Sequence, residues 1–423
     1  MNKCLVLGML LASTVTARCQ SKDLDFYVGQ ALHNSPLLKD YQNQVLSGQL
    51  DSAIVRAGYM PQVTGSSVNT YAPVINGYGY DNAISNGGNF STLVGVNKTL
   101  IGRKHLDAQY ETIRLQSQGI NNTSKISEQD LKKNITAQYI ATYGDQQQLN
   151  FNRDIYGLLQ KEERLLKDLT ERNVYRQVDY LAFLVTVKQQ SLQMRQLEIQ
   201  FQNDFNTLNY LCGIIDTTRL NGGPDTTTAT GILLRDPDLS LAPLPDPDRS
   251  IFFRQYHLDS LKLRNDRSLI DFSYRPKASL YADGGYSSTL AYQAYKNFGV
   301  SFGVTVTMPI YDGHQRKLQY SKLDIAERTR AGYKDFFTSQ YKQQIAQLSQ
   351  QLQATQELIG QINDQVKYSE ALIDVNGKLL GTGDVKVADF ILALSNYLNA
   401  KNLLTQNNIT RLQIINQINY FNR

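Results

Sequence analysis

Asp179 and Asp389 are the two residues whose type and spacing best suggest a chemical role. They lie 210 positions apart, and each follows a break in a helical pattern. A carboxylate at a helix start can cap the helix by accepting hydrogen bonds from free backbone N–H groups. Repeated around a symmetry axis, the same carboxylates would form a charged ring that favours cations over anions. The sequence leaves both interpretations open.

No other set of residues indicates a catalytic, metal-binding or phosphate-binding site. The four histidines share no metal-ligand spacing, and no Ser/His/Asp or Cys/His arrangement stands out. The four are His33, His105, His257 and His314. Gly77 and Gly79 are not followed by a helical pattern, so they do not form a phosphate loop. The sequence therefore predicts no enzymatic activity, no metal site and no cofactor.

The N-terminus predicts export. Lys3 precedes a short apolar run that ends in small residues near Ala17, which is typical of a cleaved signal peptide and too short to cross a bilayer. We expect cleavage between Ala17 and Ser21. Arg18 argues against lipidation of Cys19, because a lipobox requires small residues before the cysteine.

Charge gives no case for nucleic acid as a partner. Loss of residues 1–20 leaves 41 basic and 38 acidic residues, which is close to balance. Cys212 then remains as a single cysteine, so no internal disulfide is expected. After residue 20 the sequence has no apolar run of the 18 residues that suggest a transmembrane helix.

Long helices position the two aspartates. The stretch from His314 to Leu380 has no proline, and apolar residues recur in it at every seventh position. They are Ile345, Leu352, Ile359, Val366, Ile373 and Leu380, with Leu348 and Ile362 in the paired row. Such a repeat keeps one apolar seam facing a partner, so we expect coiled-coil packing along this helix.

The chain is an internal duplication. Asn173 and Gly383, and Asn209-Tyr210 and Asn419-Tyr420, share the 210-residue spacing of the aspartates. The expected order is a leader (1–20), repeat 1 (21–215), a linker (216–250) that we expect to be an irregular surface segment, and repeat 2 (251–423). Repeat 1 holds a helix, a hairpin (62–101), a long helix (103–170) and a helix (179–212). Repeat 2 holds a helix, a hairpin (278–310), a long helix (314–380) and a helix (389–421).

The hairpin strands alternate in polarity. From Phe298 to Met308, large apolar residues alternate with Gly, Ser and Thr. Eleven residues are enough for a tilted strand to cross a bilayer, and a small polar face suits a water-filled lumen. A half-buried strand in a soluble sandwich has the same pattern, but the very long helices do not suit a sandwich core. Tyrosines near both hairpins fit a membrane interface: Tyr71, Tyr78, Tyr80, Tyr286, Tyr292 and Tyr295.

Four strands do not close a barrel, and open strand edges are not tolerated in lipid. We therefore expect several copies to share one barrel. Three copies would give twelve strands.

The ordered features resemble the TolC-type outer-membrane efflux proteins over essentially the whole mature chain. The resemblance is carried by the duplication, by Pro61 and Pro276 before the strands, and by Gly383 six residues before Asp389. It is also carried by the strand-to-helix runs Leu100–Arg103 and Pro309–Gly313.

The resemblance implies a membrane α/β fold. A homotrimer would form a 12-stranded β-barrel in outer-membrane lipid, continued into a 12-helix tunnel in the periplasm. It implies a passive exit duct for small molecules or polypeptides in tripartite efflux or type I secretion. The implied partners are a periplasmic membrane-fusion adaptor and an inner-membrane pump of RND, ABC or MFS type.

The resemblance also assigns roles to residues at the helix breaks. The adaptor-docking tip would comprise Asn173, Val174, Gly381, Gly383 and Asp384. Asn173 replaces the family's glycine, although asparagine also tolerates a left-handed backbone. Asp389 corresponds to an acidic ring that constricts the pore, and Asp179 is its counterpart in repeat 1. The family's next acidic position is Leu392 here, which makes the ring less acidic.

Two other classes of protein remain as alternatives. An exported coiled-coil scaffold without channel activity would be elongated and soluble without detergent. An exported helical enzyme lacks a catalytic set of residues in this sequence.

Overall fold

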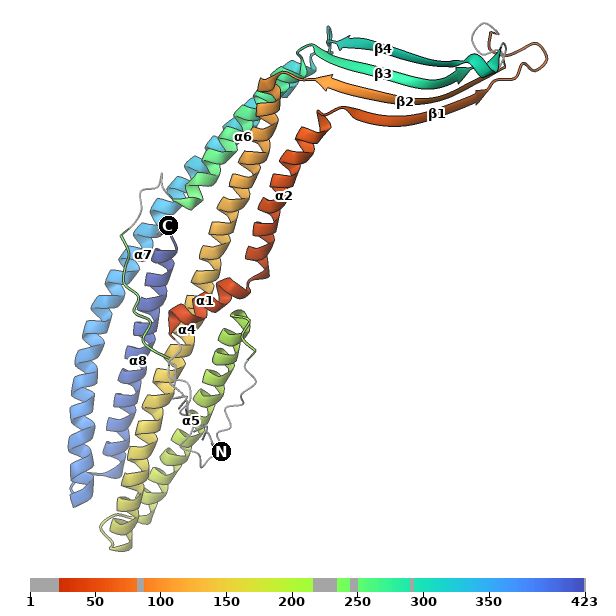
Figure 1. The fold of residues 1–423 in the computed structure, drawn as a ribbon. Helices are drawn as coiled ribbons and strands as arrows, with labels where there is room; N and C mark the ends of the chain where they lie inside the picture. Colours follow the sequence, from red (N-terminus) through yellow and green to blue (C-terminus); the bar gives the residue numbers. More distant parts are fainter. Residues whose placement is uncertain (1–22, 82–86, 216–233, 244–249, 290–292, 422–423) are drawn as a thin grey trace, which may run out of the picture. The chain divides into compact units, whose positions relative to one another are not determined.

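The computed structural model describes residues 23–81, 87–215, 234–243, 250–289 and 293–421. The expected leader with Cys19, Tyr292 and most of the linker lie outside the described residues. The helices are α1 (Leu24–Asn34), α2 (Pro36–Gly58), α4 (Arg103–Glu171), α5 (Gln177–Leu211), α6 (Ile251–Ser273), α7 (Gln315–Thr382) and α8 (Val387–Tyr420). The strands are β1 (Gln62–Tyr71), β2 (Gly88–Leu100), β3 (Lys277–Ser288) and β4 (Phe298–Thr307), with a short 3-10 helix at Ala294–Lys296 (Figure 1).

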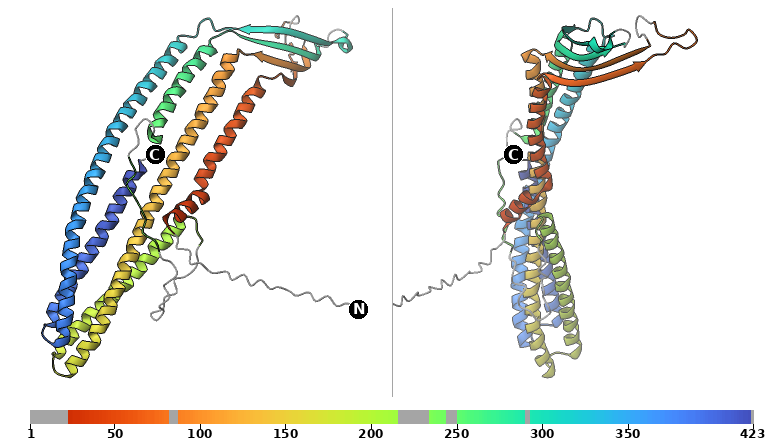
Figure 2. Two further views of the ribbon diagram at one scale, coloured as in Figure 1. Left: turned by 60° about the vertical axis from the view of Figure 1, so that its left-hand side comes forward. Right: turned by 45° about the vertical axis from the view of Figure 1, so that its right-hand side comes forward.

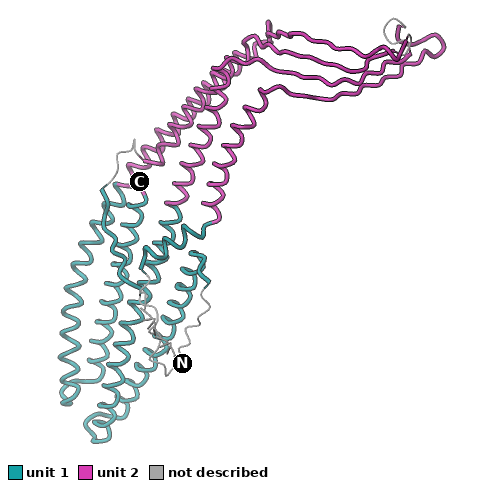
Figure 3. The backbone as a smooth tube through the Cα atoms, in the orientation of Figure 1, with its two compact units in different colours: residues 1–35, 130–243, 346–420 teal, residues 36–129, 244–345, 421–423 magenta. Residues whose placement is uncertain are grey.

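These elements form two compact units. Unit 1 comprises residues 1–35, 130–243 and 346–420, and unit 2 comprises 36–129, 244–345 and 421–423 (Figure 3). Unit 1 is helical, and unit 2 contains the sheet and the helices that join it. Each unit draws on both sequence repeats. None of the helices in the described part of the chain has an apolar stretch long enough to cross a bilayer.

The sheet of unit 2 is an antiparallel meander in the order β1-β2-β3-β4. Figure 2 shows the four strands side by side, with the helices of unit 2 joined to them at one end. β1 and β4 are the edges of the sheet, and each has a strand neighbour on one side within the described chain. Both predicted hairpins are confirmed, although the second ends at Thr307 and not at residue 310.

The register divides the sheet into an apolar and a polar face. On one face Phe302 lies opposite Ala282, Ala282 opposite Val96, and Val96 opposite Val63. Directly opposed residues point to the same side, so this row is one of several that make the face apolar. β1 contributes least to that face, because Gly65, Ser67 and Asn69 follow Val63 there.

The adjacent row shows the opposite face. Ser301, Asp283, Gly95 and Thr64 lie opposite one another across the four strands. The Ser301 hydroxyl donates a hydrogen bond to the Asp283 carboxylate at 2.8 Å. The alternation predicted from the sequence of the fourth strand therefore continues across the whole sheet.

Two larger apolar cores lie among the described residues of unit 1. One packs α4 and α5 against α7 and α8, and its members are Ile155, Leu159, Leu166, Phe183, Val187, Ile373, Leu380, Val387, Phe390 and Leu394. The other packs α1 onto α4 and α5 through Tyr27, Ala31, Ile135, Tyr139, Phe205, Leu208, Cys212 and Leu234. Leu234 is only 2% exposed. This part of the linker is irregular and most of its described residues are exposed, as predicted, while Leu234 packs into the core.

The predicted seven-residue seam on α7 is confirmed. Leu352, Val366, Ile373 and Leu380 are buried, and Ile362 and Val366 pack with Ala400 of α8. Burial of the seam against α8 gives the antiparallel helix pair its apolar interface.

Candidate functional site: the paired helix turns

The breaks between α4 and α5 and between α7 and α8 have the same backbone structure. Asn173 has φ 63° and Gly383 has φ 83°, so both adopt the left-handed conformation. Asparagine and glycine are the residues that visit this conformation at least cost. The expectation that Asn173 can replace glycine at this turn is confirmed.

Matching hydrogen bonds close both helices. The Val174 N–H donates to the Leu169 carbonyl at 2.9 Å, and the Asp384 N–H donates to the Leu379 carbonyl at 3.1 Å. A second bond in each turn runs from the left-handed residue to the carbonyl three positions earlier. This pattern is the Schellman motif, which satisfies carbonyls that the end of a helix leaves free.

The two turns contact each other. The Tyr175 hydroxyl is within hydrogen-bond distance of two carbonyl oxygens of the second turn, Leu380 at 3.1 Å and Val385 at 2.9 Å. A Cβ added to Gly383 would lie 2.8 Å from Cγ1 of Val174. The turns are thus packed closely enough that Gly383 has both a conformational and a steric reason to be glycine.

Buried side chains of the adjacent core pack against the turns. Leu380 at the end of α7 and Leu166 near the end of α4 are fully buried, and the Phe183 and Phe390 rings lie 6.0 Å apart. Rigid packing at this depth fixes where the exposed turn residues are presented. Gly381 is different, since a Cβ there would make an ordinary contact of 3.6 Å with Leu165.

Asp179 is held by a neighbouring cation. α5 begins at Gln177, and its N-cap position is Arg176, which makes no side-chain cap. Asp179 therefore lies in the first turn, and its carboxylate pairs with the Arg176 guanidinium at 2.9 and 3.1 Å. This hydrogen bonding lowers the pKa of Asp179. The N-capping interpretation is wrong for Asp179, because the helix starts two residues earlier than its sequence pattern indicated.

Asp389 occupies the same place in α8 but has no such partner. α8 begins at Val387, so Asp389 also lies in the first turn and does not cap the helix. Its carboxylate is exposed, and within the described residues no cation or hydrogen-bond donor contacts it. Lys386 stands where Arg176 stands in the first repeat, but makes no ion pair with Asp389. The full negative charge of Asp389 is therefore available, and that of Asp179 is largely compensated.

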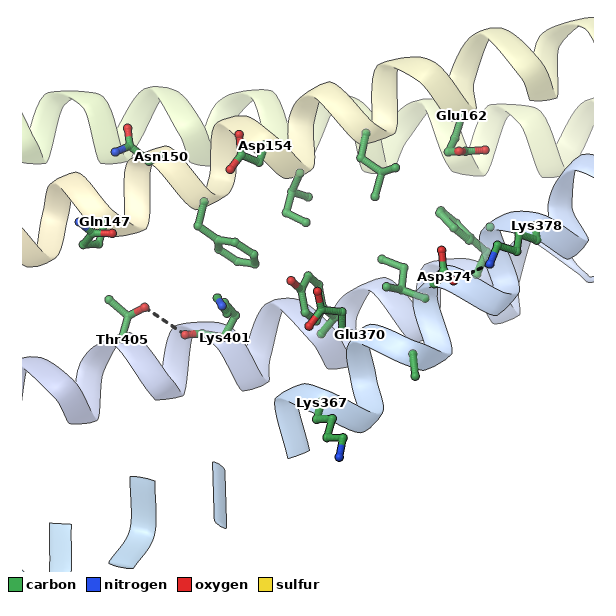
Figure 4. Close-up of a pocket in the computed structure, with 18 residues that line it drawn as sticks. Gln147, Asn150, Asp154, Glu162, Lys367, Glu370, Asp374, Lys378, Lys401 and Thr405 are labelled. Atoms are coloured by element: carbon green, nitrogen blue, oxygen red, sulfur yellow. Dashed lines mark hydrogen bonds and ion pairs between the residues drawn. The ribbon is translucent and has the colours of Figure 1, made fainter. Parts of the chain in front are cut away.

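A groove of about 1080 Å³ lies beside the turns in unit 1, between α4, α7 and α8. Its apolar residues include Phe151, Ile155 and Phe390, and charged side chains stand around them (Figure 4). The Lys378 ammonium pairs with Asp374 at 2.7 Å. Burial raises the pKa of Glu162, which lies on the α4 side of the groove. An apolar floor with charged residues around it suits an amphipathic helix.

The residues predicted to dock an adaptor lie at the two turns. Asn173, Val174, Gly383 and Asp384 are exposed at the two turns, and Gly381 is half-buried. In the described ranges, no three His, Cys, Asp or Glu side chains gather to hold a metal ion.

Sequence reasoning missed the contacts that join the turns. The weak signal for Tyr175 is its position, since it is the counterpart of Val385 in a duplicated turn. The signal for Arg176 is its spacing of three residues from Asp179, which suits an ion pair across one helical turn. A second missed pair is Asp145 with Asp204, between α4 and α5, where burial and the neighbouring carboxyl raise the pKa of Asp145 to about 8.

The fold matches solved structures of outer-membrane proteins. The Campylobacter jejuni CmeC outer membrane channel is 12% identical, with a TM-score of 0.71 over 94% of this chain and 85% of that one. The Vibrio cholerae outer membrane protein VceC is 15% identical, with a TM-score of 0.68 over 94% and 96%. The open-state Neisseria gonorrhoeae MtrE outer membrane channel is 12% identical, with a TM-score of 0.70 over 94% and 88%. No family model and no curated protein matches the sequence. The chain therefore has the protomer fold of these channels.

Proposed function

We propose that three copies of this chain form a passive duct through the outer membrane, continued by a helical tunnel in the periplasm. The duct carries small molecules or polypeptides out of the cell and catalyses no reaction. Work is supplied by an inner-membrane pump, which delivers its substrate through a periplasmic adaptor.

The observation that carries this proposal is the sheet of unit 2. It has one apolar face, one polar face and two edges without a strand neighbour within the described chain. An open sheet exposes unpaired N–H and C=O groups, which lipid does not tolerate, whereas a closed barrel leaves none. Pairing of β1 with β4 of the next copy would close the sheet, with the apolar face toward lipid.

The helices of unit 2 support the same head-to-tail contact. α2 leads into edge strand β1, and its Leu46, Leu50 and Ile54 side chains are more than half exposed. α7 follows edge strand β4 and exposes Leu318, Ile325 and Phe336 to a similar extent. Two different apolar surfaces at opposite edges suit a heterologous interface, which closes into a ring when the rotation permits.

The paired turns fit the role of a gate at the inner end of the tunnel. Asp389 supplies the unpaired carboxylate for a constricting acidic ring, and Asp179 contributes less because Arg176 compensates it. We expect opening when α4 and α7 move outward at these turns together with α5 and α8.

The groove beside the turns supports an adaptor contact. A helical hairpin of an adaptor could place its apolar face on Phe151 and Phe390 and its charges against the rim. Val174 and Asp384 extend this surface to the turns. RND, ABC and MFS pumps are all compatible with such an adaptor.

The test is a pair of measurements on the purified protein. A duct predicts a detergent-dependent trimer in the outer-membrane fraction and discrete conductance steps in a planar bilayer. A monomer that is soluble without detergent and conducts nothing would instead support the coiled-coil scaffold.

A further inference from the structure

All four connections between strands and helices of unit 2 lie at one end of the sheet. The register sets this end, since Gln62 lies opposite Asn97, Leu100 opposite Ala278, and Lys277 opposite Thr307. Figure 1 shows the helices joining the strands at this end. Residues far apart in the sequence therefore gather around one rim.

That rim is strongly basic. Within five positions of the strand and helix ends at the connections there are eight lysines and arginines but only three acidic residues. We call the eight the junction collar: Arg56, Lys98, Arg103, Lys104, Arg275, Lys277, Arg316 and Lys317. Every one of them is exposed, although the whole chain carries a formal net charge of only +5.

Most of the collar has no anionic partner. Arg316 pairs with Asp271 at 2.7 Å, and Arg275 lies over the Phe272 ring. Among the described residues no ion pair involves the other six members. Asp312 accepts hydrogen bonds from the backbone N–H groups of His314 and Arg316, which compensates its charge. Asp107 is the remaining acid beside these cations.

A band of apolar and aromatic side chains adjoins the collar. Ile310 is 92% exposed and Tyr311 is 79% exposed, and Met60 and Leu100 are about half exposed. Along the β4–α7 connection the chain runs from the apolar strand face through Tyr311 to Arg316 and Lys317. The same order is found across a membrane–water interface.

Lys98 connects the collar to the apolar face. It lies opposite Leu280, in the same face as Val96, and two residues before β2 ends. A lysine there can bury its methylene chain along the apolar surface and extend its ammonium to the headgroups.

From this arrangement we infer that the junction collar binds the phosphate groups of anionic phospholipids at the periplasmic surface of the outer membrane. The inference rests on the proposed insertion of the sheet into lipid. Lipid phosphate is the occupant that fits, because the cations form a rim beside exposed apolar residues and not an enclosed pocket. Basic residues gathered next to a membrane-spanning surface attract anionic headgroups.

The experiment compares two variants with four Lys→Gln changes each. The collar variant changes Lys98, Lys104, Lys277 and Lys317. The control changes Lys161, Lys167, Lys334 and Lys342, which are also exposed but lie in α4 and α7, outside the strand–helix connections. Full-length protein in detergent micelles is mixed with phosphatidylglycerol or phosphatidylcholine, and lipids bound per trimer are counted by native mass spectrometry.

We expect the wild type and the control to prefer phosphatidylglycerol, and the collar variant to lose at least tenfold of that preference. An equal preference in all three proteins would overturn the inference. Loss of the phosphatidylglycerol preference in excess inorganic phosphate at matched ionic strength would also overturn the inference, since that result would indicate a site for a free anion.

Two further measurements keep the test decisive. If the collar variant does not assemble, salt dependence of lipid binding by the wild type replaces it: the preference must fall as ionic strength rises, and a salt-independent preference contradicts the inference. Wild-type conductance in a planar bilayer separates the two proposals. If the protein conducts but shows no lipid preference, only the lipid-binding role of the junction collar is contradicted. If it neither inserts nor conducts, the proposed duct is contradicted.

Discussion

The Tyr175 hydroxyl lies 2.9 Å from the carbonyl oxygen of Val385, the residue that occupies the same place in the second repeat. The duplication has therefore produced two turns that recognise each other with different chemistry. The first turn supplies a phenol, and the second supplies backbone carbonyl oxygens. This cross-repeat bond is the natural point at which to test whether the turns move.

Tyr175→Phe removes the donor and keeps the ring. We expect a loss of about 0.5–1.5 kcal/mol in local stability, measured as faster hydrogen exchange of the amides around residues 379–387, and more frequent channel openings. Tyr180→Phe is the matched control, because the Tyr180 ring packs on the same core but makes no hydroxyl hydrogen bond in the described structure. Equal exchange in the two variants would contradict a role for the Tyr175 hydroxyl.

High pH tests the same bond without mutation. Burial, followed by the charges of Asp384 and Asp179, raises the pKa of Tyr175 above that of a free tyrosine. The stabilisation is therefore complete below the unfolded pKa of about 10 and is lost as pH rises through the higher folded value. After correction for the base-catalysed intrinsic rate, protection of the turn amides from exchange should fall above pH 10 in the wild type but not in Tyr175→Phe.

Gly383→Ala should destabilise the second turn for two separable reasons. The left-handed backbone costs about 1–2 kcal/mol with a side chain, and the new Cβ would meet Val174 Cγ1 at 2.8 Å. Adding Val174→Ala should restore the steric part only. Asn173→Gly should leave the first turn at least as stable. Thermal unfolding followed by circular dichroism ranks the four proteins, and a fully stable Gly383→Ala would refute this account.

Asp389→Ala should raise single-channel conductance or weaken block by cations, because it removes the uncompensated carboxylate. Asp179→Asn is the comparison, and its effect should be smaller since Arg176 already pairs with that carboxylate at 2.9 Å. An unchanged trace for Asp389→Ala would reject the acidic ring.

Adjacent positions of β4 test which face of the sheet meets lipid. Val304 belongs to the apolar face, and Thr305 to the polar face. Lysine at a lipid-facing position near mid-membrane costs about 2–4 kcal/mol. Val304→Lys should therefore lower the yield of protein in the outer-membrane fraction, and Thr305→Lys should insert and change ion selectivity. The reverse order would place lipid on the other face.

The half-buried Asp145 predicts an unusual response to pH in unit 1. Burial and the Asp204 carboxyl raise its pKa to about 8, while Asp204 accepts hydrogen bonds from Gln138 and Gln200. The contribution of Asp145 to stability is complete below its unfolded pKa of about 4 and is lost as pH rises toward 8. Asp145→Asn should weaken this decline in the unfolding temperature, and Asp154→Asn, exposed on the same helix, should leave it unchanged.

The periodicity of the sequence was sufficient to predict the helices, the strands and the alternating faces of the sheet. The apolar seam of α7 and the left-handed Asn173 were both predicted, because each depends on residues close together in the chain. A seven-residue repeat and a turn conformation are local properties.

The contacts between the turns could not be predicted from the sequence, because they join residues far apart in the chain. Tyr175 and Val385 are 210 residues apart, and their pairing follows from how α4, α5, α7 and α8 pack. The helix starts at Gln177 and Val387 were also misplaced, because an aspartate in the first turn and one at the cap leave the same pattern. The pairing of Asp145 with Asp204 likewise depends on which faces of α4 and α5 meet.

Cys212 is fully buried beneath α1, and burial raises its pKa to about 11. A thiol that stays protonated and shielded reacts poorly with maleimides at neutral pH. With the predicted leader and its two cysteines cleaved, Cys212 would not compete with engineered labels. Asp384→Cys would place three spin or fluorescent probes in the proposed trimer, and their separations would report the width of the proposed inner opening.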